Sequence, residues 1–144
     1  MAMEPAACLK AVAVLVKAHD SVHACIKRDA ANAGLNPTEF SVMELLLHKG
    51  TLPTQEIGRR VLISSGSITY VVDKLEAKKL VRRTPCPTDR RITFTELTES
   101  GRTLIDDAFF RHRKNVENLF AEVEADQLET MISTLKQIGR KAEG

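Results

Sequence analysis

The most constraining feature of this chain is a change of hydrophobic period between residues 64 and 97. The apolar positions of the first part recur at a helical spacing and fall within an arc of about 100° on one side of a helix: Ile68, Val71, Val72 and Leu75. Residues 81–84 and 92–97 instead have the composition of short strands. In the second of these, Ile92 and Phe94 alternate with threonines, although Glu96 interrupts the alternation. The pattern predicts a helix followed directly by a β-hairpin.

The remainder of the chain is predicted to be helical. A long helical pattern covers residues 5 to about 33, and a short helix is expected within residues 51–61. Between them lies a second helix whose termini are marked by Asn36 as the N-cap, Pro37 in the first turn, Glu39 as the capping-box partner and Gly50 at the end. Thr98 is expected to cap a long helix that breaks near residues 122–125 before a last helix. We therefore predict one mostly α domain of the α+β class over residues 1–144.

The loop between the two predicted strands has the sequence PCPTDRR, residues 85–91. Its two prolines reduce the conformational freedom of the loop, and Asp89 is placed to pair with Arg91 two residues along. The guanidinium groups of Arg90 and Arg91 suit the minor groove or the backbone of DNA, where negative potential is concentrated. We interpret this loop as an ordered cationic tip in which Asp89 orients Arg91.

Positive charge is concentrated in the middle of a chain whose net charge is only +2. Between Arg59 and Arg91 there are nine Lys and Arg residues and three acids, whereas residues 98–144 carry nine acids and seven bases. A localised basic segment in a near-neutral protein is what a polyanion-binding surface requires. A solvated basic face is the alternative interpretation.

The helix that precedes the hairpin has an outward face of small and hydroxyl-bearing residues, with Ser64 as its expected N-cap. Small residues let a helix enter the major groove of DNA, which is roughly 12 Å wide, and hydroxyl groups contact bases or phosphates. With a short helix before it and a cationic hairpin after it, this helix fits the winged helix-turn-helix pattern. The predicted DNA-binding residues are Ser64, Ser65, Ser67, Thr69, Tyr70, Lys74, Asp89, Arg90 and Arg91.

The whole chain resembles the MarR family of transcriptional regulators. The resemblance is carried by LNPTEFSVMELL, by ISSGSITYVVDKLEAKKLVRR, and by PTDRRITFTELTESG with its D-x-R element. CPTDRR, together with SGSITYVVDKLE and LNPTEF, is similar to the quinone-responsive, MhqR-like subgroup. It implies a homodimeric repressor in which residues 1–34 and 98–144 form dimerisation helices and residues 35–97 form the winged-helix region. It also implies a pseudo-palindromic double-stranded operator, with recognition helices about 34 Å apart. Small anionic or phenolic ligands, quinones among them, or oxidants are expected to release the DNA.

The terminal helices supply the positions that we expect to pack across the subunit interface. These positions are Leu9, Val12, Leu128, Ile132 and Leu135. Packing within a single chain is the alternative for the same residues.

The histidines raise a question of ligand binding. His19 and His23 stand four residues apart, a spacing that can hold a metal ion on one helical face. No acidic or Cys ligand clearly joins them, so we predict no metal site and no cofactor. They are instead candidates for an effector pocket below the second helix with Phe40 and Met43, and His48 is a further candidate. His112, within FRHRKN, is expected on a solvated basic stretch.

Three cysteines, an odd number without a CxxC motif, argue against a disulfide framework or a structural zinc site and favour a reducing cytoplasm. Cys86 lies in the hairpin loop, where many wings of the family carry an acid. Nearby arginines, Arg83 among them, are expected to lower the pKa of its thiol. Cys86 and Cys8 are candidate redox sensors. The alternatives are a tolerated small residue at Cys86 and a packing role for Cys8 and Cys25.

Other classes of protein find less support. No apolar run approaches the ~18–20 residues of a membrane span, and the N-terminal residues do not read as a signal peptide. The sequence has no Ser-His-Asp order with supporting turns, no phosphate-binding glycine loop and no recognisable carboxylate pair, so we do not expect an enzyme. A winged-helix module for protein–protein interaction is the remaining alternative, and it would leave the basic hairpin unused.

Overall fold

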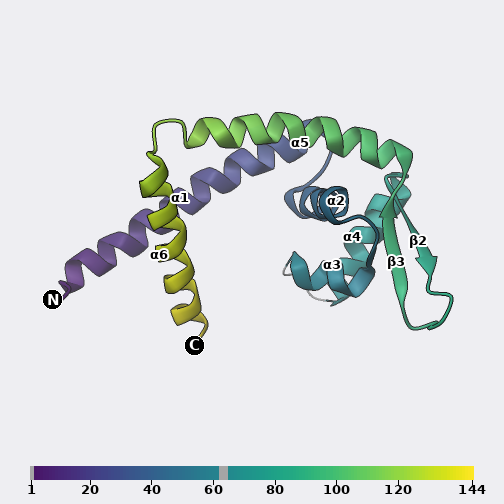
Figure 1. The fold of residues 1–144 in the computed structure, drawn as a ribbon, viewed down its shortest axis with the longest axis horizontal. Coiled ribbons are helices and arrows are strands. Elements are labelled where there is room, and N and C mark those ends of the chain that lie inside the picture. The colour runs from purple at the N-terminus through teal and green to yellow at the C-terminus, as the bar shows by residue number, and fades with distance from the viewer. Residues whose placement is uncertain (1, 62–64) are drawn as a thin grey trace. The chain divides into compact units, whose positions relative to one another are not determined.

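The computed structural model describes residues 2–61 and 65–144 (Figure 1). In order along the chain, the elements are α1 (Pro5–Asn32), α2 (Pro37–Lys49), β1 (Leu52–Pro53), α3 (Thr54–Arg60), α4 (Ser65–Ala77), β2 (Val81–Pro85), β3 (Thr93–Leu97), α5 (Glu99–Leu119) and α6 (Ala125–Glu143). The mostly helical prediction is confirmed, with predicted and observed ends agreeing within one or two residues for most elements. None of the helices within these ranges is long and apolar enough to cross a membrane.

The contacts divide the chain into two compact units, one that ends at His112 and one that comprises Arg113–Gly144. The first unit contains the helices and strands from α1 to β3 and most of α5. The second contains the end of α5 and the whole of α6, in which no residue is buried.

The start of α2 follows the predicted capping box. The backbone N–H of Glu39 donates to Asn36 Oδ1 at 2.8 Å, and the backbone N–H of Asn36 donates to Glu39 Oε1 at 2.9 Å. At the other end, Gly50 has a φ of +77°, a conformation that side chains with a Cβ rarely adopt, and it ends the helix.

The three strands form an antiparallel sheet in the order β1-β3-β2. The hairpin of β2 and β3 was predicted, but β1 was missed because two residues, one of them a proline, give no strand period. Leu52 pairs with Thr95, and Thr95 pairs in turn with Arg83 on β2. Figure 1 shows the hairpin extending beside α4.

On β3, the buried residue is a threonine. Thr95 is fully buried and its hydroxyl lies 2.8 Å from that of Thr54, whereas Ile92 is exposed and Phe94 is half-buried. Because a hydroxyl can be buried at low cost when it finds a partner, the alternation of apolar and polar residues in this strand does not reveal which face points inward.

The core of the first unit lies among α2, α3, α4, the strands and the first half of α5. The predicted apolar arc of α4 is confirmed, since Ile68, Val72 and Leu75 are fully buried and Val71 is 8% exposed. The hydrophobic face of α4 therefore determines which of its side chains face the solvent.

On α3, Arg59 and Arg60 lie on the outside, where both pair with Glu56.

The prediction for His112 was wrong. Its side chain is only 12% exposed, and its Nδ1 lies 2.7 Å from Asp29 Oδ2 near the end of α1. The ring also packs edge-on against Phe40, with 5.1 Å between the ring centroids. The basic neighbours of His112 in the sequence do point outward, but position 112 falls on the inner face of α5.

Candidate nucleic-acid interface

The outward face of α4 carries the predicted polar residues. Ser67, Thr69 and Tyr70 are exposed, as is Gly66, and Tyr70 keeps 62% of its surface exposed. The Lys74 ammonium lies 5.4 Å from the centre of the Tyr70 ring, within the range of a cation–π contact. Ser65 begins the helix, whereas the predicted N-cap, Ser64, lies outside the described residues. Opposite its buried arc, α4 thus presents a narrow hydroxyl-bearing surface.

The tip of the hairpin holds Arg91 by a two-point contact with Asp89. Arg91 Nε and Nη2 donate to the two carboxylate oxygens at 3.1 and 3.0 Å, and the backbone N–H of Arg91 donates to Asp89 Oδ1 at 3.0 Å. The Arg91 guanidinium holds the pKa of the Asp89 carboxyl below its usual range. The Arg91 side chain is nevertheless 89% exposed. The predicted pairing is present, and it directs an exposed cation without burying it.

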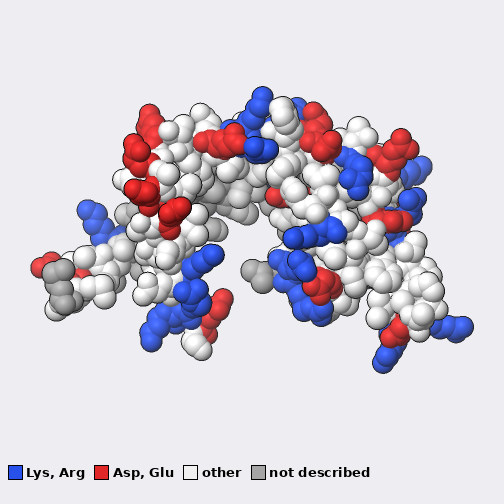
Figure 2. All heavy atoms as spheres, viewed as in Figure 1, with Lys and Arg blue, Asp and Glu red and all other residues white. Residues whose placement is uncertain are grey.

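Backbone hydrogen bonds keep the loop closed below this tip. The N–H of Cys86 donates to the carbonyl of Ile92 at 2.9 Å, and the N–H of Ile92 donates to the carbonyl of Asp89 at 3.1 Å. Arg90 is exposed and has no carboxylate partner among the described residues. Figure 2 shows Lys and Arg side chains at the tip of the hairpin and over the helices beside it.

The base of the hairpin is joined to α4 by ion pairs that the sequence analysis missed. Arg83 Nη2 lies 2.6 Å from Asp73 Oδ1 and 2.8 Å from Glu76 Oε1. On the other side of β2, Arg82 pairs with Glu96 of β3 at 2.6 Å. Asp73 and Glu76 are three residues apart on α4, and this spacing places them on one face, but the sequence did not reveal that β2 returns along that face.

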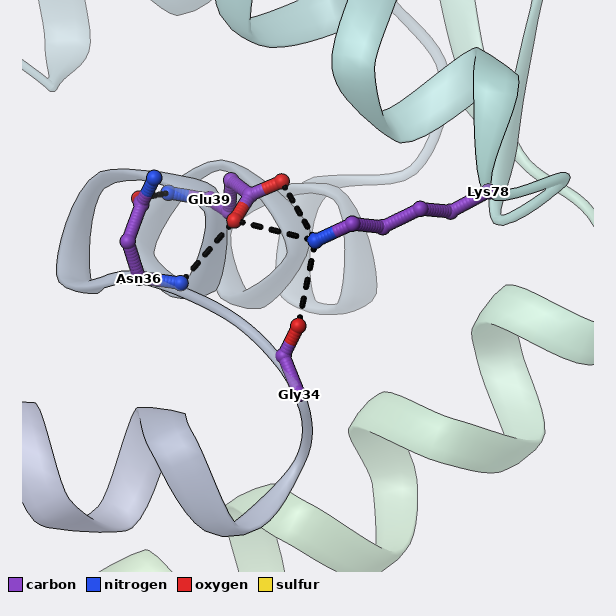
Figure 3. Close-up of polar contacts among 4 residues, drawn as sticks. All are labelled: Gly34, Asn36, Glu39 and Lys78. Atoms are coloured by element: carbon purple, nitrogen blue, oxygen red, sulfur yellow. Dashed lines mark hydrogen bonds and ion pairs between the residues drawn. The ribbon is translucent and has the colours of Figure 1, made fainter.

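The end of α4 is also tied to the start of α2 (Figure 3). Lys78 Nζ donates to both oxygens of the Glu39 carboxylate, at 3.0 and 3.2 Å, and to the carbonyl of Gly34 at 3.0 Å. Glu39 is only 4% exposed, so the capping carboxylate depends on Lys78 for its counter-charge. The capping box predicted for one helix is therefore also a contact between α2 and the turn that follows α4.

Cys86 has a lowered pKa, but the expected cause was wrong. The thiol lies 3.3 Å from the hydroxyl of Thr88, and this hydrogen bond, followed by those to the backbone of Thr88 and Asp89, lowers the pKa of the thiol. The negative charge of Asp89 acts in the opposite direction. Arg83 points instead to Asp73 and Glu76. Cys86 itself is half-buried.

The other predicted ligand and redox residues fall into separate places. Phe40 and Met43 are buried in the core, whereas His19 and His23 lie on the exposed surface of α1 with their rings stacked at 5.8 Å. Cys8 is exposed near the start of α1. Further along that helix, Cys25 is half-buried and accepts a hydrogen bond from Arg28. His48 packs against Phe109 with 4.7 Å between ring centroids.

The predicted interface positions carry large exposed apolar side chains. Leu9 and Val12 on α1 are 72% and 59% exposed, and Ile132 and Leu135 on α6 are 45% and 39% exposed. Leu128 is half-buried. The assignment of these positions to a subunit interface stays a prediction.

Two adjacent helices followed by an antiparallel hairpin with a cationic tip define a winged helix-turn-helix DNA-binding protein. The chain belongs to the MarR family of transcriptional regulators. The MarR family profile matches residues 35–93. Over 134 residues, the chain is 44% identical to the HTH-type transcriptional regulator MhqR of Bacillus subtilis (strain 168), covering 93% of this chain and 92% of that protein. The family predicted from three stretches of sequence is confirmed, and its members are regulators rather than enzymes.

Solved structures share the fold. Sco3205, a MarR family transcriptional regulator from Streptomyces coelicolor solved in complex with DNA, gives a TM-score of 0.89 at 19% identity, covering 98% of this chain and 91% of that one. BpsR of Bordetella bronchiseptica, whose DNA binding is regulated by 6-hydroxynicotinic acid, gives a TM-score of 0.77 at 19% identity, covering 90% and 98%. The winged-helix prediction is thus confirmed at the level of the fold.

Proposed function

We propose that this regulator acts as a homodimer joined by its terminal helices. The exposed apolar residues of α1, and separately those of α6, support this proposal, since large exposed apolar side chains grouped on a helix mark interaction sites. A second copy of the chain would cover these residues in a symmetric interface. The dimer would present two winged-helix regions to a pseudo-palindromic operator.

In this proposal, the wing tip and α4 contact different parts of the duplex. Arg91 and Arg90 reach the minor groove or the phosphate backbone, with Asp89 orienting Arg91. Ser67, Thr69, Tyr70 and Lys74 face the major groove, and Ser64 and Ser65 belong to the same set by their positions in the sequence. The single observation that carries the assignment is the two-point Asp89–Arg91 pair, which aims a cation that remains 89% exposed.

We further propose that the bound dimer represses transcription until a small aromatic ligand releases it. The regulation of BpsR by 6-hydroxynicotinic acid supports a ligand of this kind. Of the candidate effector residues, His19 and His23 are exposed on α1 whereas Phe40 and Met43 lie in the core, and a phenol or quinone is the candidate ligand. Oxidation of Cys86 or Cys8 is an alternative means of release. Because the operator is chromosomal DNA, we expect the protein in the cytoplasm.

The wing assignment is tested by selecting a duplex from a randomised library with the wild-type protein and measuring its affinity for Arg91→Ala. We expect Arg91→Ala to bind about tenfold more weakly, and the slope of log K against log salt to fall by about 0.9 because one phosphate contact is lost. Arg113→Ala is the matched control, since Arg113 is 68% exposed and pairs with Glu117 outside the winged-helix region.

The control should bind as the wild type does. Binding of Arg91→Ala at wild-type strength would remove the wing from the interface. If the wild-type protein selects no duplex even at low salt, the DNA-binding assignment fails and the protein–protein alternative gains support.

A further inference from the structure

The base of the hairpin is anchored to neighbouring elements, and Arg83 lies in this anchored part. Arg83 pairs across the sheet with Thr95, which pairs in turn with Leu52 of β1. The hydroxyl of Thr95 is fixed by Thr54 at the start of α3. On the β3 side, β1 and α3 therefore hold the hairpin. Toward the tip, Pro53 pairs with Phe94 and Thr54 Oγ1 donates to the carbonyl of Thr93 at 2.9 Å, so residues 86–92 extend beyond this support.

On the β2 side, the support comes from α4 through Arg83. Glu76 Oε1 accepts from the guanidinium at 2.8 Å, while its Oε2 accepts from the backbone N–H of Arg83 at 3.1 Å. Asp73 adds a contact of 2.6 Å to the same guanidinium nitrogen. Two carboxylates thus hold both the main chain and the side chain of one strand residue. The pairing raises the pKa of Arg83 and lowers the pKa of Glu76, so both groups stay charged at neutral pH.

The two acids are unfavourable for DNA binding on electrostatic grounds alone. Asp73 and Glu76 are on α4, which the proposed function places in the major groove, and their side chains are 54% and 41% exposed. Arg83 supplies one positive charge to two negative ones, and its side chain is only 27% exposed. A phosphate contact would require an arginine that points outward, as Arg91 does.

We propose that Arg83 is a positioning residue, which through Asp73 and Glu76 sets the direction of the wing relative to α4 and does not itself contact DNA. This inference rests on the proposed DNA contacts of the wing and of α4. A hairpin held at a fixed angle brings its tip and the hydroxyl-bearing face of α4 to one duplex at the same time. A hairpin released from α4 retains its charge but must be ordered when DNA binds, and this ordering weakens specific binding.

The decisive variant is Asp73→Asn/Glu76→Gln, which preserves side-chain volume and makes the region more positive by two charges. If net charge alone controlled affinity, this variant would bind every duplex more tightly. If Arg83 is a positioning residue, affinity for the duplex selected by the wild type falls about tenfold, while affinity for a scrambled duplex of the same composition stays equal or rises. Glu56→Gln is the control, because Glu56 is an acid on α3 whose carboxylate pairs with Arg59 and Arg60 of the same helix.

A second variant, Arg83→Met, separates positioning from phosphate contact. We expect weaker binding to the selected duplex with the salt slope of the wild type, whereas a slope lower by about 0.9 would show a lost phosphate contact and overturn the inference. Melting curves check that each variant is folded. If Asp73→Asn/Glu76→Gln binds the selected duplex as tightly as the wild type or more tightly, the inference about Arg83 is also overturned. If the wild type selects no duplex, the proposed DNA-binding function is wrong. The selection step shows this before any variant is compared.

Discussion

At the tip of the wing, the side chains of Arg91 and Cys86 are held by contacts with residues two positions away. Asp89 and Arg91 were predicted to pair because they are two positions apart in a restricted loop, and the structure shows that pair. The cause of the lowered Cys86 pKa was not predictable in the same way. Arginines are close to Cys86 in the sequence, but the loop turns the hydroxyl of Thr88 toward the thiol.

The Thr88 contact leads to a prediction about thiol reactivity. Because this hydrogen bond stabilises the thiolate, Thr88→Val should raise the pKa of Cys86 and slow its alkylation by iodoacetamide at pH 7. Mass spectrometry of the labelled peptides against pH measures the change for each cysteine separately. The rate at Cys25 serves as an internal control and should not change. An unaltered pH profile at Cys86 would show that Thr88 does not control the thiol.

The start of α5 is defined by close packing against the turn after α4. Thr98 Oγ1 accepts from the N–H of Gly101 at 3.0 Å and donates to the carbonyl of Lys79 at 2.8 Å, so the predicted cap is confirmed. Gly101 is buried against the backbone of Leu80. The sequence shows only a glycine in the first turn of a helix, which does not reveal that the backbone of Leu80 lies against it.

Gly101→Ala should therefore be strongly destabilising. An added Cβ would lie 1.9 Å from the carbonyl oxygen of Leu80, which is backbone and cannot move without displacing β2. We expect the free energy of unfolding to fall by about 2–3 kcal/mol, measured by urea denaturation. Gly139→Ala is the control, because nothing lies within 4 Å of its added Cβ. That change should stabilise α6 by about 0.5–1 kcal/mol. Equal effects of the two substitutions would contradict the close approach at Gly101.

The contact between α2 and the end of α4 predicts a coupling between Glu39 and Lys78. Lys78→Met leaves the buried Glu39 carboxylate without its counter-charge, and we expect a loss of about 1–2 kcal/mol, moderated by solvent because the Lys78 side chain is 40% exposed. The free energy of unfolding should fall less for Glu39→Gln/Lys78→Met than for Lys78→Met alone, since an uncharged glutamine can still accept the hydrogen bond from Asn36. A double-mutant cycle by urea denaturation measures the coupling. Additive effects would show that the pair contributes nothing.

The whole molecule presents apolar surface that one chain leaves uncovered. The exposed residues of α1 and α6 were predicted as interface positions, partly from their helical spacing and partly from the family resemblance. Their exposure agrees with that assignment, and the interface itself is a proposal.

Leu135→Glu should shift the proposed dimer to monomer, because a carboxylate would be placed in an apolar interface. Sedimentation velocity at several concentrations measures the change. Ser133→Glu, on the same helix and also exposed, adds the same charge outside the set of apolar interface positions and should leave the dimer intact. A wild-type protein that sediments as a monomer at all concentrations would refute the proposed assembly.

Much of this protein follows from the order of its residues alone. Helix caps, the apolar arc of α4, the hairpin and the Asp89–Arg91 pair are set by interactions between residues close in the sequence, so local patterns are enough to predict them. The burial of Thr95 and His112, the strand β1, the contact of Glu39 with Lys78 and the anchoring of Arg83 on α4 were decided by tertiary structure. Each of these depends on segments that meet only when the chain folds, and no local period records which partner a polar side chain will find there.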